Sequence, residues 1–545
     1  MERISKFLQR LPILAILLFL AGIGMLSLLF ATTPGVGVTP DSVVYFDLAR
    51  NLSDGHGFVA TNCEGNETPT TRFPPLFPAL LALFGKAGIA PVLAARWLNL
   101  LLFGANILLV GLVLRRYTNN SLYPAALGSF FMLSSPAMIE THSTAWTEPL
   151  FFFFGMAGLL SISVYLETGR KGLLIYGSSA IALACLARYV GGTLIAAAVA
   201  GIFVLGRQGY RRKFAAAILC GIVSILPIAL WSLRNFFLSG NAVGRIPRFH
   251  PVSFDNVRAL VMIASSWLVP GSDRIVFLPA QDVLTSVILF FAIAGLLAAG
   301  SRLLVLTLRQ SNGSPFPVRL AKTPVLFLVF FLLYPVLLFV ATAYFDATAP
   351  FEIDNRILSP AYIAGLIVVL YLMHALFQVS VRGSALRVAL YSIGSAMIGV
   401  YTVAGAAAFI YLHVYGRGFT AKEWQFDKVA ARLHDLASDT LIYSNYPTAV
   451  YFRTGRTSCA LPRFADTHLP AGMEMIRRLE TGQAVVVYFH NARKFTPRNP
   501  AAVKQDLPTE ADLQSLSSLV SLSLLEQEGH TLLYRTTGLV PNTEP

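Results

Sequence analysis

Long apolar runs separated by short polar segments fill the first three quarters of the chain. A spanning helix needs about 20 mostly apolar residues, and eleven segments of roughly this kind can be placed. They lie at about 12–31, 92–114, 122–139, 147–167, 173–187, 190–206, 214–234, 282–304, 323–344, 357–378 and 388–413. The fifth is short, and only Arg188 and Tyr189 separate it from the sixth, so it is a candidate for a kinked or half-crossing element. The pattern predicts a mainly α-helical membrane protein with about 11 spans.

Two polar segments between these runs are long, at about 32–91 and 235–281. Each contains an apolar stretch too short to span a bilayer, at 74–84 and at 259–270, which favours helices that lie in the membrane interface. Long loops in a compact domain are usually functional. These two loops are therefore the first candidates for chemistry.

The pattern changes near residue 414. Residues 414–545 contain 27 charged residues in 132 positions, whereas residues 1–413 contain 43 in 413. Apolar residues recur at helical spacing near 422–437, and strand-like runs follow at 440–443, 449–452, 484–489 and 531–534. We predict a membrane domain over 1–413 and a small soluble α/β domain over 414–545.

The composition agrees with a membrane protein. The 545 residues are 55% hydrophobic and 13% charged, with a mean hydropathy of +0.63. A net charge of +14 would indicate nucleic-acid binding in a soluble protein. Here the basic residues are scattered between apolar runs, so we expect no nucleic-acid partner.

The basic residues instead predict the orientation of the chain. With the N-terminus in the cytoplasm, the inward loops hold 17 Lys and Arg residues and only two acidic ones, Glu2 and Glu167. The first apolar run is too long for a signal peptide and lacks a cleavage site before Pro34, so we interpret it as an uncleaved anchor. An odd number of spans then places residues 414–545 outside. We expect an integral cytoplasmic (inner) membrane protein whose long loops face the periplasm or exterior.

The four cysteines exclude a disulfide framework and a CxxC-type zinc or redox site, because no two of them are close together. Cys63 and Cys459 would share the outer compartment. The sequence leaves open whether these two cysteines pair.

Ionisable residues at the membrane rim are costly and are therefore candidates for function. Asp41 follows the first span, directly after Pro40, where a helix is predicted to begin. Asp41 and Tyr45 would share one face of that helix at i, i+4. The alternative is that Asp41 only caps the helix, and the two roles are compatible.

Glu148 lies at the outer end of the fourth predicted span, directly before Pro149. A carboxylate at this position also suits the positive end of the helix dipole, which is the purely structural interpretation. One loop earlier, we interpret Glu140 and His142 as solvated rim residues.

Arg356 begins the tenth predicted span, after Asp354. An outward arginine needs an anionic partner, either that carboxylate or a lipid phosphate, which a guanidinium binds bidentately. Arg72, Arg188 and Arg234 are further outward arginines open to the same two interpretations. Proton abstraction needs a carboxylate base, and a phosphate leaving group needs fixed positive charge. The rim therefore carries the groups that an enzyme needs in order to transfer a group from a lipid phosphate.

The same residues resemble motifs of the glycosyltransferase C superfamily, in the branch of the protein O-mannosyltransferases and lipid A aminoarabinose transferases. The matching segments are Asp41 with Tyr45, Gly55-His56-Gly57, Phe73-Pro74-Pro75-Leu76, Thr147-Glu148-Pro149-Leu150, Trp231-x-x-Arg234-Asn235, and Asn355-Arg356 followed by Pro360. They are short, but their order and predicted side of the membrane agree over nearly all of residues 30–360.

The resemblance implies an enzyme that transfers a sugar from a polyprenyl-phosphate donor, with inversion, on the outer face of the membrane. It implies that Asp41 activates the acceptor hydroxyl as a base, and that Arg356 and Arg72 bind the lipid phosphate. Tyr45 and Glu148 would shape the pocket, and Arg234 is a further candidate substrate-binding residue. The acceptor could be a glycan, a lipid or a protein.

The chain departs from this family at two places. Phe73 precedes the Pro-Pro pair where the aminoarabinose transferases have Lys, and Ser42 stands where the family has a second acidic residue. Asp47 does not replace that residue at its spacing. The donor sugar therefore stays open. No cofactor is predicted, because no His, Asp or Glu cluster has metal-ligand spacing. The alternative is an enzyme that uses a divalent cation.

Two other functions are compatible with a multi-span chain. A lipid or solute transporter or flippase would place ionisable residues in mid-span and break helices at the midplane, whereas the predicted span centres are almost free of charge. A non-catalytic assembly protein would not need the outer carboxylates and arginines. We therefore predict a membrane glycosyltransferase whose partners are the bilayer, a polyprenyl-phosphate sugar and an acceptor.

Overall fold

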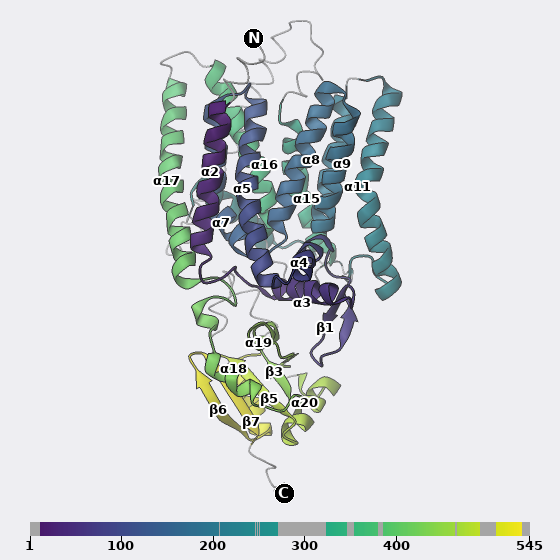
Figure 1. Ribbon diagram of the computed structural model, residues 1–545, viewed down its shortest axis with the longest axis vertical. Helices are drawn as coiled ribbons and strands as arrows, with labels where there is room; N and C mark the ends of the chain where they lie inside the picture. Colours follow the sequence, from purple (N-terminus) through teal and green to yellow (C-terminus); the bar gives the residue numbers. More distant parts are fainter. Residues whose placement is uncertain are drawn as a thin grey trace.

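The computed structural model of the protein describes residues 11–206, 208–245, 247, 249, 251–270, 323–345, 354–379, 385–463, 466–490 and 508–536. A helical bundle forms one part of the molecule, and a small domain with a β-sheet packs beneath one end of it (Figure 1). The fold is thus mainly helical with a C-terminal mixed sheet.

Among the described residues, seven helices are long and apolar enough to cross a membrane. They are α2 (Leu11–Ala31), α5 (Pro91–Tyr117), α8 (Glu148–Thr168), α11 (Tyr210–Ser239), α15 (Val325–Phe345), α16 (Asn355–Val379) and α17 (Ala385–Tyr415). These helices make the chain a multi-pass integral membrane protein.

An eighth candidate span is a bent pair, α6 (Leu122–Ser134) and α7 (Pro136–Ser143), whose axes differ by 58°. Pro136 causes the break, because the residue before a proline is driven out of the helical region. Ser135 accordingly has extended backbone angles, φ −70° and ψ 120°. After this break α7 packs against α5, α16 and α17.

Two predicted spans form shorter helices, α9 (Lys171–Ala187) and α10 (Gly192–Leu205), joined by the single 3₁₀ turn η1 (Tyr189–Gly191). Seventeen residues of α9 extend about 26 Å, which is less than the bilayer core of about 30 Å. Helices lie at every predicted span within the described residues, and the predicted span at 282–304 lies outside them. By length and composition, the described residues contain seven or eight candidate spans, so a total of eleven stays a prediction.

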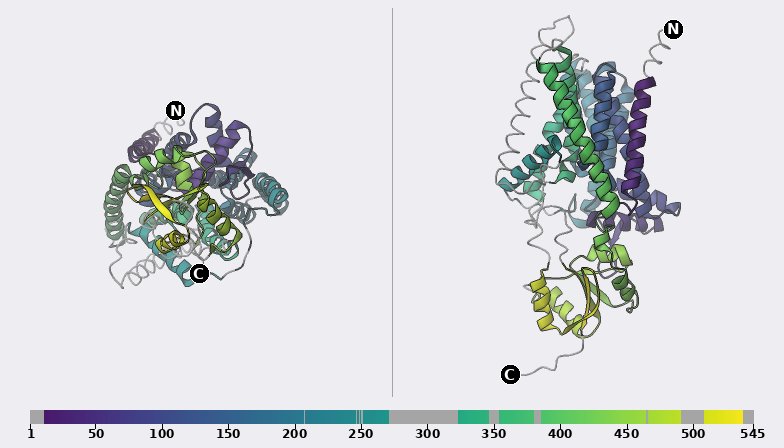
Figure 2. Two further views of the ribbon diagram at one scale, coloured as in Figure 1. Left: turned by 90° about the horizontal axis from the view of Figure 1, so that it is seen from below. Right: turned by 90° about the vertical axis from the view of Figure 1, so that its left-hand side faces the viewer.

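Helices also form in both long loops. In the first, α3 (Pro40–Asp54) and α4 (Leu76–Lys86) lie across the end of the bundle that faces the β-sheet domain, with the hairpin β1 (Val59–Thr61) and β2 (Glu67–Pro69) between them (Figures 1 and 2). In the second, α12 (Phe254–Leu268) begins at a capping box between Ser253 and Asn256. The chain therefore concentrates its non-spanning helices at one end of the bundle.

The C-terminal domain is a five-stranded sheet in the order β4-β3-β5-β7-β6. Its strands are β3 (Leu441–Ser444), β4 (Cys459–Ala460), β5 (Ala484–Phe489), β6 (Leu522–Glu528) and β7 (Thr531–Thr536). β3 is parallel to both β4 and β5, whereas β7 is antiparallel to β5 and β6. Every residue of β5 is buried, as expected for a central strand covered on both faces.

Helices of this domain are η3 (Lys422–Trp424), α18 (Asp427–His434), α19 (Pro447–Thr454), α20 (Pro470–Glu480) and α21 (Glu510–Leu519). The strand predicted at 449–452 is wrong, because this segment is the middle of α19. Pro447 occupies the first turn and Gly455 ends the helix with a φ of 69°. These two helix-end signals outweigh the strand-like composition of residues 449–452, so the segment forms a helix.

Candidate active site

The site begins at the first turn of α3. Thr39 is the N-cap residue and Pro40 occupies the first helical position. Ser42 completes the cap, since its Oγ accepts the Thr39 N–H at 3.1 Å and donates to the carbonyl of Ala145 at 3.0 Å. Because Thr39 and Ser42 cap the helix, the alternative that Asp41 only serves as a cap is wrong, and its carboxylate is available for other contacts.

Glu148 is the first residue of α8 and its side chain is completely buried. Arg188, at the junction of α9 and η1, donates from Nη1 to Glu148 Oε1 and also to Thr147 Oγ1 at 3.4 Å. A buried carboxylate is tolerated only when it is paired and hydrogen-bonded. Glu148 is therefore more than a helix-dipole residue, because it joins α8 to the end of α9.

Arg356, in the first turn of α16, links the two carboxylates. Its Nη1 donates to Asp41 Oδ2 at 2.8 Å and its Nε to Glu148 Oε1 at 2.5 Å. Its guanidinium lies 4.4 Å from the centre of the Trp146 ring, a cation–π contact. Asp354, one of the two partners that the sequence left open, instead accepts the Ile357 N–H at 2.8 Å. The site thus gathers Asp41, Glu148, Arg188 and Arg356 from four separate segments.

Burial divides the roles of the two carboxylates. The Asp41 side chain is 32% exposed, whereas that of Glu148 is 0% exposed. Burial raises the pKa of Asp41, but the charges of Arg356, Arg72 and Arg188 more than offset this, so the pKa lies below its usual value. Asp41 is consequently ionised at neutral pH, and it is the more exposed of the two carboxylates.

Tyr45 lies one helical turn after Asp41 on α3. Its ring packs edge-on against Phe73 and Phe77, with centroids 5.0 Å and 5.5 Å away. Burial raises the pKa of Tyr45, and the negative charge of Asp41 raises it further. Tyr45 therefore stays protonated beside Asp41, as a neutral group that can donate a hydrogen bond.

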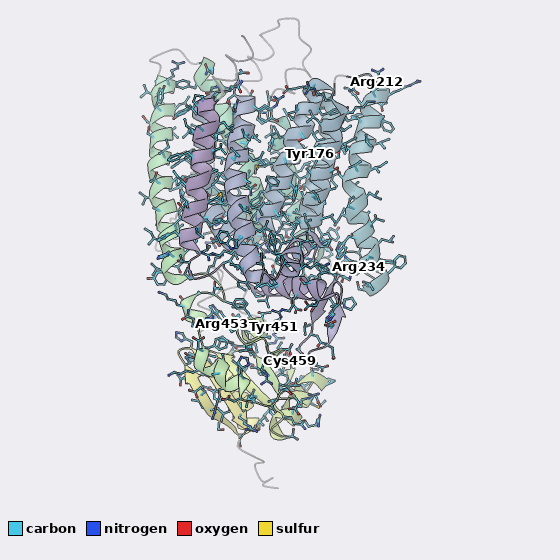
Figure 3. All side chains as sticks on the ribbon, viewed as in Figure 1. Tyr176, Arg212, Arg234, Tyr451, Arg453 and Cys459 are labelled. Atoms are coloured by element: carbon cyan, nitrogen blue, oxygen red, sulfur yellow. A yellow bond between two sulfur atoms is a disulfide. The ribbon has the colours of Figure 1, made fainter. Side chains whose placement is uncertain are left out.

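Arg72 and Arg234 do not join the ion cluster directly. Within the described residues, the exposed Arg72 side chain makes no hydrogen bond or ion pair, and its guanidinium lies 5.7 Å from the Phe73 ring centre. Arg234 donates to the carbonyls of Thr70 at 3.0 Å and Phe58 at 3.4 Å. Figure 3 places Arg234 at the end of the bundle that faces the C-terminal domain.

Asn235, the residue after Arg234, holds the loop segment that Arg234 contacts, around residues 70–71. Asn235 is completely buried, and its Nδ2 donates to the carbonyls of Thr71 and Ala242 and to Tyr189 Oη, each at 3.2 Å. The Arg234-Asn235 pair thus fixes the backbone that immediately precedes Arg72. The side chain of Arg234 is hydrogen-bonded to the loop backbone, whereas the guanidinium donors of Arg72 are unpaired among the described residues.

His142 is not a solvated rim residue, which corrects that expectation. It is completely buried, with Nδ1 2.7 Å from the Met138 carbonyl oxygen and Nε2 3.1 Å from Asn106 Nδ2. Glu140 is partly buried and bonds Arg417 at 2.5 Å. Both side chains are thus held by contacts within the protein rather than by solvent.

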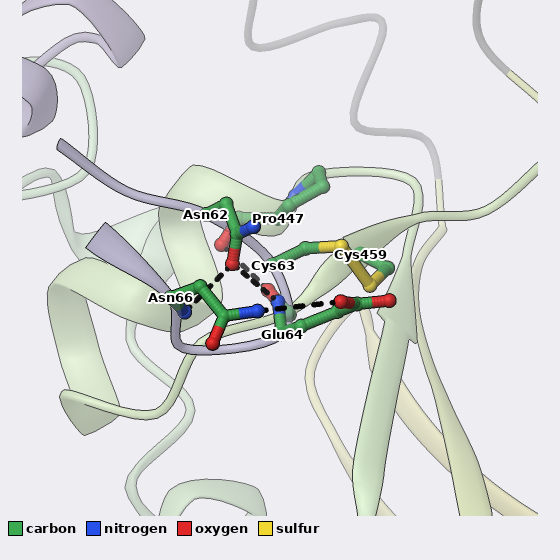
Figure 4. Close-up of a disulfide and its surroundings, with 7 residues drawn as sticks. Asn62, Cys63, Glu64, Asn66, Pro447 and Cys459 are labelled. Carbon is green, nitrogen blue, oxygen red and sulfur yellow. Dashed lines mark hydrogen bonds between the residues drawn. A yellow bond between two sulfur atoms is a disulfide. The ribbon is translucent and has the colours of Figure 1, made fainter. Parts of the chain in front are cut away.

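Asp47 points to the C-terminal domain. It accepts the Thr61 N–H at 2.6 Å and the Tyr451 hydroxyl of α19 at 2.6 Å. The structure also forms the disulfide Cys63–Cys459, the pairing that the sequence left open (Figure 4). The first long loop, which carries Asp41, is thus tied to the C-terminal domain by a covalent bond and by hydrogen bonds.

In the described part of the chain, no three His, Cys, Asp or Glu side chains come together as a metal site. The carboxylates of Asp41 and Glu148 are both bonded to Arg356.

Sequence reasoning did not select three residues of this site. In the sequence Arg188 is only one of several outward arginines, and Trp146 belongs to no motif. Arg417, whose guanidinium lies 5.2 Å from the centre of the Trp146 ring, follows the last span and carries no motif. Only the fold brings it to the site.

No family model and no curated protein sequence matches this chain. Among solved structures, it is similar to the oligosaccharyltransferase of Archaeoglobus fulgidus in the apo form, with 13% identity and a TM-score of 0.55 over 96% of this chain and 74% of that one. The same enzyme tethered to an acceptor peptide containing the NVT sequon matches with 12% identity and a TM-score of 0.53, over 98% and 75%.

A third similar structure is ArnT from Cupriavidus metallidurans bound to undecaprenyl phosphate, with 15% identity and a TM-score of 0.49 over 95% of this chain and 97% of that one. At these identities the likeness to the oligosaccharyltransferase concerns the fold. The chain therefore shares the overall fold of the Archaeoglobus fulgidus oligosaccharyltransferase.

Proposed function

We propose that this chain is a membrane glycosyltransferase that transfers a sugar from a polyprenyl-phosphate donor to an acceptor hydroxyl, with inversion. The observation that carries the proposal is the cluster of Asp41, Arg356, Glu148 and Arg188 at the end of the bundle facing the C-terminal domain. The fold shared with a membrane oligosaccharyltransferase supports it.

In the proposed reaction, the ionised Asp41 takes the proton of the acceptor hydroxyl. The acceptor oxygen then attacks the anomeric carbon, and the bond from that carbon to the phosphate oxygen breaks. The phosphate oxygen leaves with the electron pair, so the products are the glycosylated acceptor and the polyprenyl phosphate. A positioned base of this kind contributes about 10²–10⁴-fold to the rate.

The charges of the cluster fit an anionic donor. Two carboxylates balance the guanidiniums of Arg356 and Arg188, and the nearby Arg72 adds a positive charge that no described carboxylate neutralises. Arg72 is therefore proposed as the first ligand of the donor phosphate, with Arg356 beside it. Glu148 holds Arg356 in place, Tyr45 borders the pocket, and Arg234 acts through the segment that carries Arg72.

The distribution of basic residues supports an orientation with the site and the C-terminal domain outside the cytoplasmic membrane. Arg116, Arg170 and Arg212 lie at the helix ends remote from the C-terminal domain, and Figure 3 labels Arg212 there. Basic residues favour the cytoplasmic side. In this orientation residues 1–413 form the membrane domain and residues 414–545 the extracytoplasmic domain.

The alternatives are a transporter or flippase and a non-catalytic assembly protein. A transporter site is expected near the bilayer midplane, whereas the cluster described here lies at one end of the bundle, at the first turns of α3, α8 and α16. An assembly protein would not need the partly exposed, ionised carboxylate of Asp41 near the guanidinium of Arg72, which is unpaired within the described ranges of the chain.

The test uses the full chain, expressed in a bacterial strain that lacks its own polyprenyl-phosphate sugar synthases. Membranes receive one radiolabelled polyprenyl-phosphate sugar at a time, and the label transferred to the protein, glycan and lipid fractions is counted. We expect transfer from at least one donor by the wild type and by Asp54→Asn, an exposed control on the same helix.

Asp41→Asn is expected to transfer about 10²–10⁴-fold less. Equal transfer by Asp41→Asn and the wild type would overturn the role of Asp41. A folded wild type that transfers none of the donors would contradict the proposed function itself.

A further inference from the structure

The linker that joins α17 to the C-terminal domain runs through the base of the site. The Val38 N–H donates to the Arg417 carbonyl at 3.4 Å, and the Phe419 N–H donates back to the Val38 carbonyl at 2.8 Å. Gly418 has a φ of 57°, and a Cβ there would overlap the Val38 carbonyl oxygen. The linker thus lies directly against the residues that lead into α3.

The other side of the same segment pairs with the residues that lead into α8. The Gly37 N–H donates to the Ser143 carbonyl at 2.7 Å, and the Ala145 N–H donates to the Gly37 carbonyl at 2.9 Å. Three segments far apart in sequence therefore lie side by side. One precedes Asp41, one precedes Glu148, and the third is the linker.

The Arg417 side chain extends this contact to the reacting groups. Its guanidinium lies 5.2 Å from the centre of the Trp146 ring, the same ring that lies 4.4 Å from the Arg356 guanidinium. The Trp146 indole N–H donates to Thr39 Oγ1 at 3.0 Å, so the ring also touches the cap of α3. Trp146 therefore connects Arg417 both to Arg356 and to the helix of Asp41.

Arg417 is itself held in one position. Its Nη2 donates to Glu140 Oε1 at 2.5 Å. A Cβ on Gly37 would lie 3.1 Å from Arg417 Cβ and 3.2 Å from Arg417 Cδ, so the aliphatic part of the side chain packs against the Gly37 backbone. Only 20% of the side chain is exposed. A fixed, planar guanidinium of this kind is suited to hold an aromatic ring.

We propose that Arg417 is a positioning residue of the active site: it fixes Trp146, and through Trp146 it sets the placement of Arg356 and of the first turn of α3. The inference rests on the proposed function for its kinetic consequence, but its structural consequence can be measured without any activity. It also gives the linker, which the sequence assigned to the soluble domain, a direct part in the catalytic geometry.

The experiment compares the purified full chain with Arg417→Ala, Arg417→Lys and the control Arg432→Ala, which removes an exposed arginine of α18. Hydrogen–deuterium exchange is measured on peptides covering residues 37–47. We expect at least fivefold faster exchange there in Arg417→Ala. Arg417→Lys should show an intermediate rate, because the charge opposite Glu140 is kept while the planar face is lost. Arg432→Ala should match the wild type.

Transfer kinetics provide the second readout. For Arg417→Ala we expect kcat to fall at least tenfold while the donor KM changes less than threefold, with partial recovery in Arg417→Lys. If Arg417→Ala does not fold, Glu140→Gln releases the same side chain and should change exchange and kcat in the same direction. Unchanged exchange over residues 37–47, or a kcat equal to the wild type, overturns the proposal. A wild type without transferase activity contradicts the proposed function, whereas the exchange result still decides the role of Arg417.

Discussion

Arg356 donates from Nε to the completely buried Oε1 of Glu148 at 2.5 Å, although 208 positions separate the two residues in the chain. Glu148 also accepts from Arg188, so one buried carboxylate is shared by two guanidiniums from different helices. An isolated charge is costly in such a place, and a paired one is retained only with good geometry. This contact therefore fixes how α16, α8 and the end of α9 meet at the site.

The first prediction concerns Glu148→Gln. This isosteric change removes the negative charge and leaves Arg188 and Arg356 facing each other at a buried position. Breaking a buried pair costs about 3–5 kcal/mol, so we expect a clear drop in thermal stability in detergent. The matched control is Glu167→Gln at the remote end of the bundle, whose partner Arg116 is 33% exposed. Its cost should stay below about 1 kcal/mol, and equal costs would contradict the buried role of Glu148.

The second prediction concerns the pH dependence of the proposed transfer. Arg356 holds the pKa of Asp41 below its usual value against the effect of burial. A base of depressed pKa acts above that pKa, so activity should persist down to about pH 4, the usual aspartate range, and fall only below it. Removing the guanidinium in Arg356→Gln should shift this acid limb upward by about 1–3 pH units.

The measurement is kcat/KM from pH 4 to 9 for the wild type, Arg356→Gln and the control Arg115→Gln. Arg115 lies in the last turn of α5, far from the site. Over this range the wild type should show no acid limb, whereas Arg356→Gln should show one, so an equally flat profile for Arg356→Gln would mean that Asp41 is not the group that titrates.

Sequence patterns located most of the fold because apolar length and helix ends are local signals. Pro40 marks the start of α3, and the helix begins there. The segment 449–452 was assigned wrongly because four residues of strand-like composition carry less information than the Pro447 and Gly455 that bound α19. The number of spans could not be fixed, since α9 and α10 are apolar yet short.

The site was predictable only as a set of candidates. Asp41, Glu148 and Arg356 each stood at a helix start on one face, which the pattern reveals, but their pairing depends on how α3, α8 and α16 pack. Asp354 was an equally good partner for Arg356 by spacing, and the structure assigns it instead to the first turn of α16. Arg417 carried no signal because its contact with Trp146 arises from a linker about 270 positions away.

The third prediction concerns the covalent link between the first long loop and the C-terminal domain. The disulfide Cys63–Cys459 spans 396 positions, and it requires an oxidising compartment. Non-reducing peptide mapping after alkylation should recover Cys63 joined to Cys459, while the buried Cys185 and Cys220 remain reduced. The double variant Cys63→Ser/Cys459→Ser should lose about 2–5 kcal/mol, seen as earlier proteolysis of the C-terminal domain. Recovery of free Cys63 from membranes would contradict the outer placement of this loop.

The fourth prediction separates the ring of Tyr45 from its hydroxyl. The ring packs against Phe73 and Phe77, so Tyr45→Ala should cost about 3–5 kcal/mol of stability. Tyr45→Phe keeps this packing and should melt within a few degrees of the wild type. Its hydroxyl is held neutral by burial and by Asp41, which raise its pKa. Loss of one hydrogen bond to substrate, worth about 0.5–1.5 kcal/mol, should lower kcat/KM up to about tenfold. Unchanged kcat/KM would limit Tyr45 to packing.

The last prediction concerns Arg72 and the residue pair that holds its segment. The guanidinium donors of Arg72 are unpaired among the described residues, whereas those of Arg234 donate to the carbonyls of Thr70 and Phe58. If Arg72 binds the donor phosphate in the ground state and in the transition state alike, Arg72→Gln raises the donor KM and leaves kcat nearly unchanged. We expect about a tenfold rise in KM, which corresponds to about 1.4 kcal/mol. Arg234→Gln should raise KM in the same direction but less, because it loosens the loop without removing the charge.

The control for both variants is Lys86→Gln, which removes an exposed charge at the end of α4 without touching the segment of Arg72. Inhibition by the polyprenyl phosphate alone gives an independent measure, because the lipid lacks the sugar and reports phosphate binding only. Its inhibition constant should rise in parallel with the donor KM in Arg72→Gln. A fall in kcat at constant KM would instead place Arg72 with the groups that act only in the transition state, and the assignment as a ground-state phosphate ligand would fail.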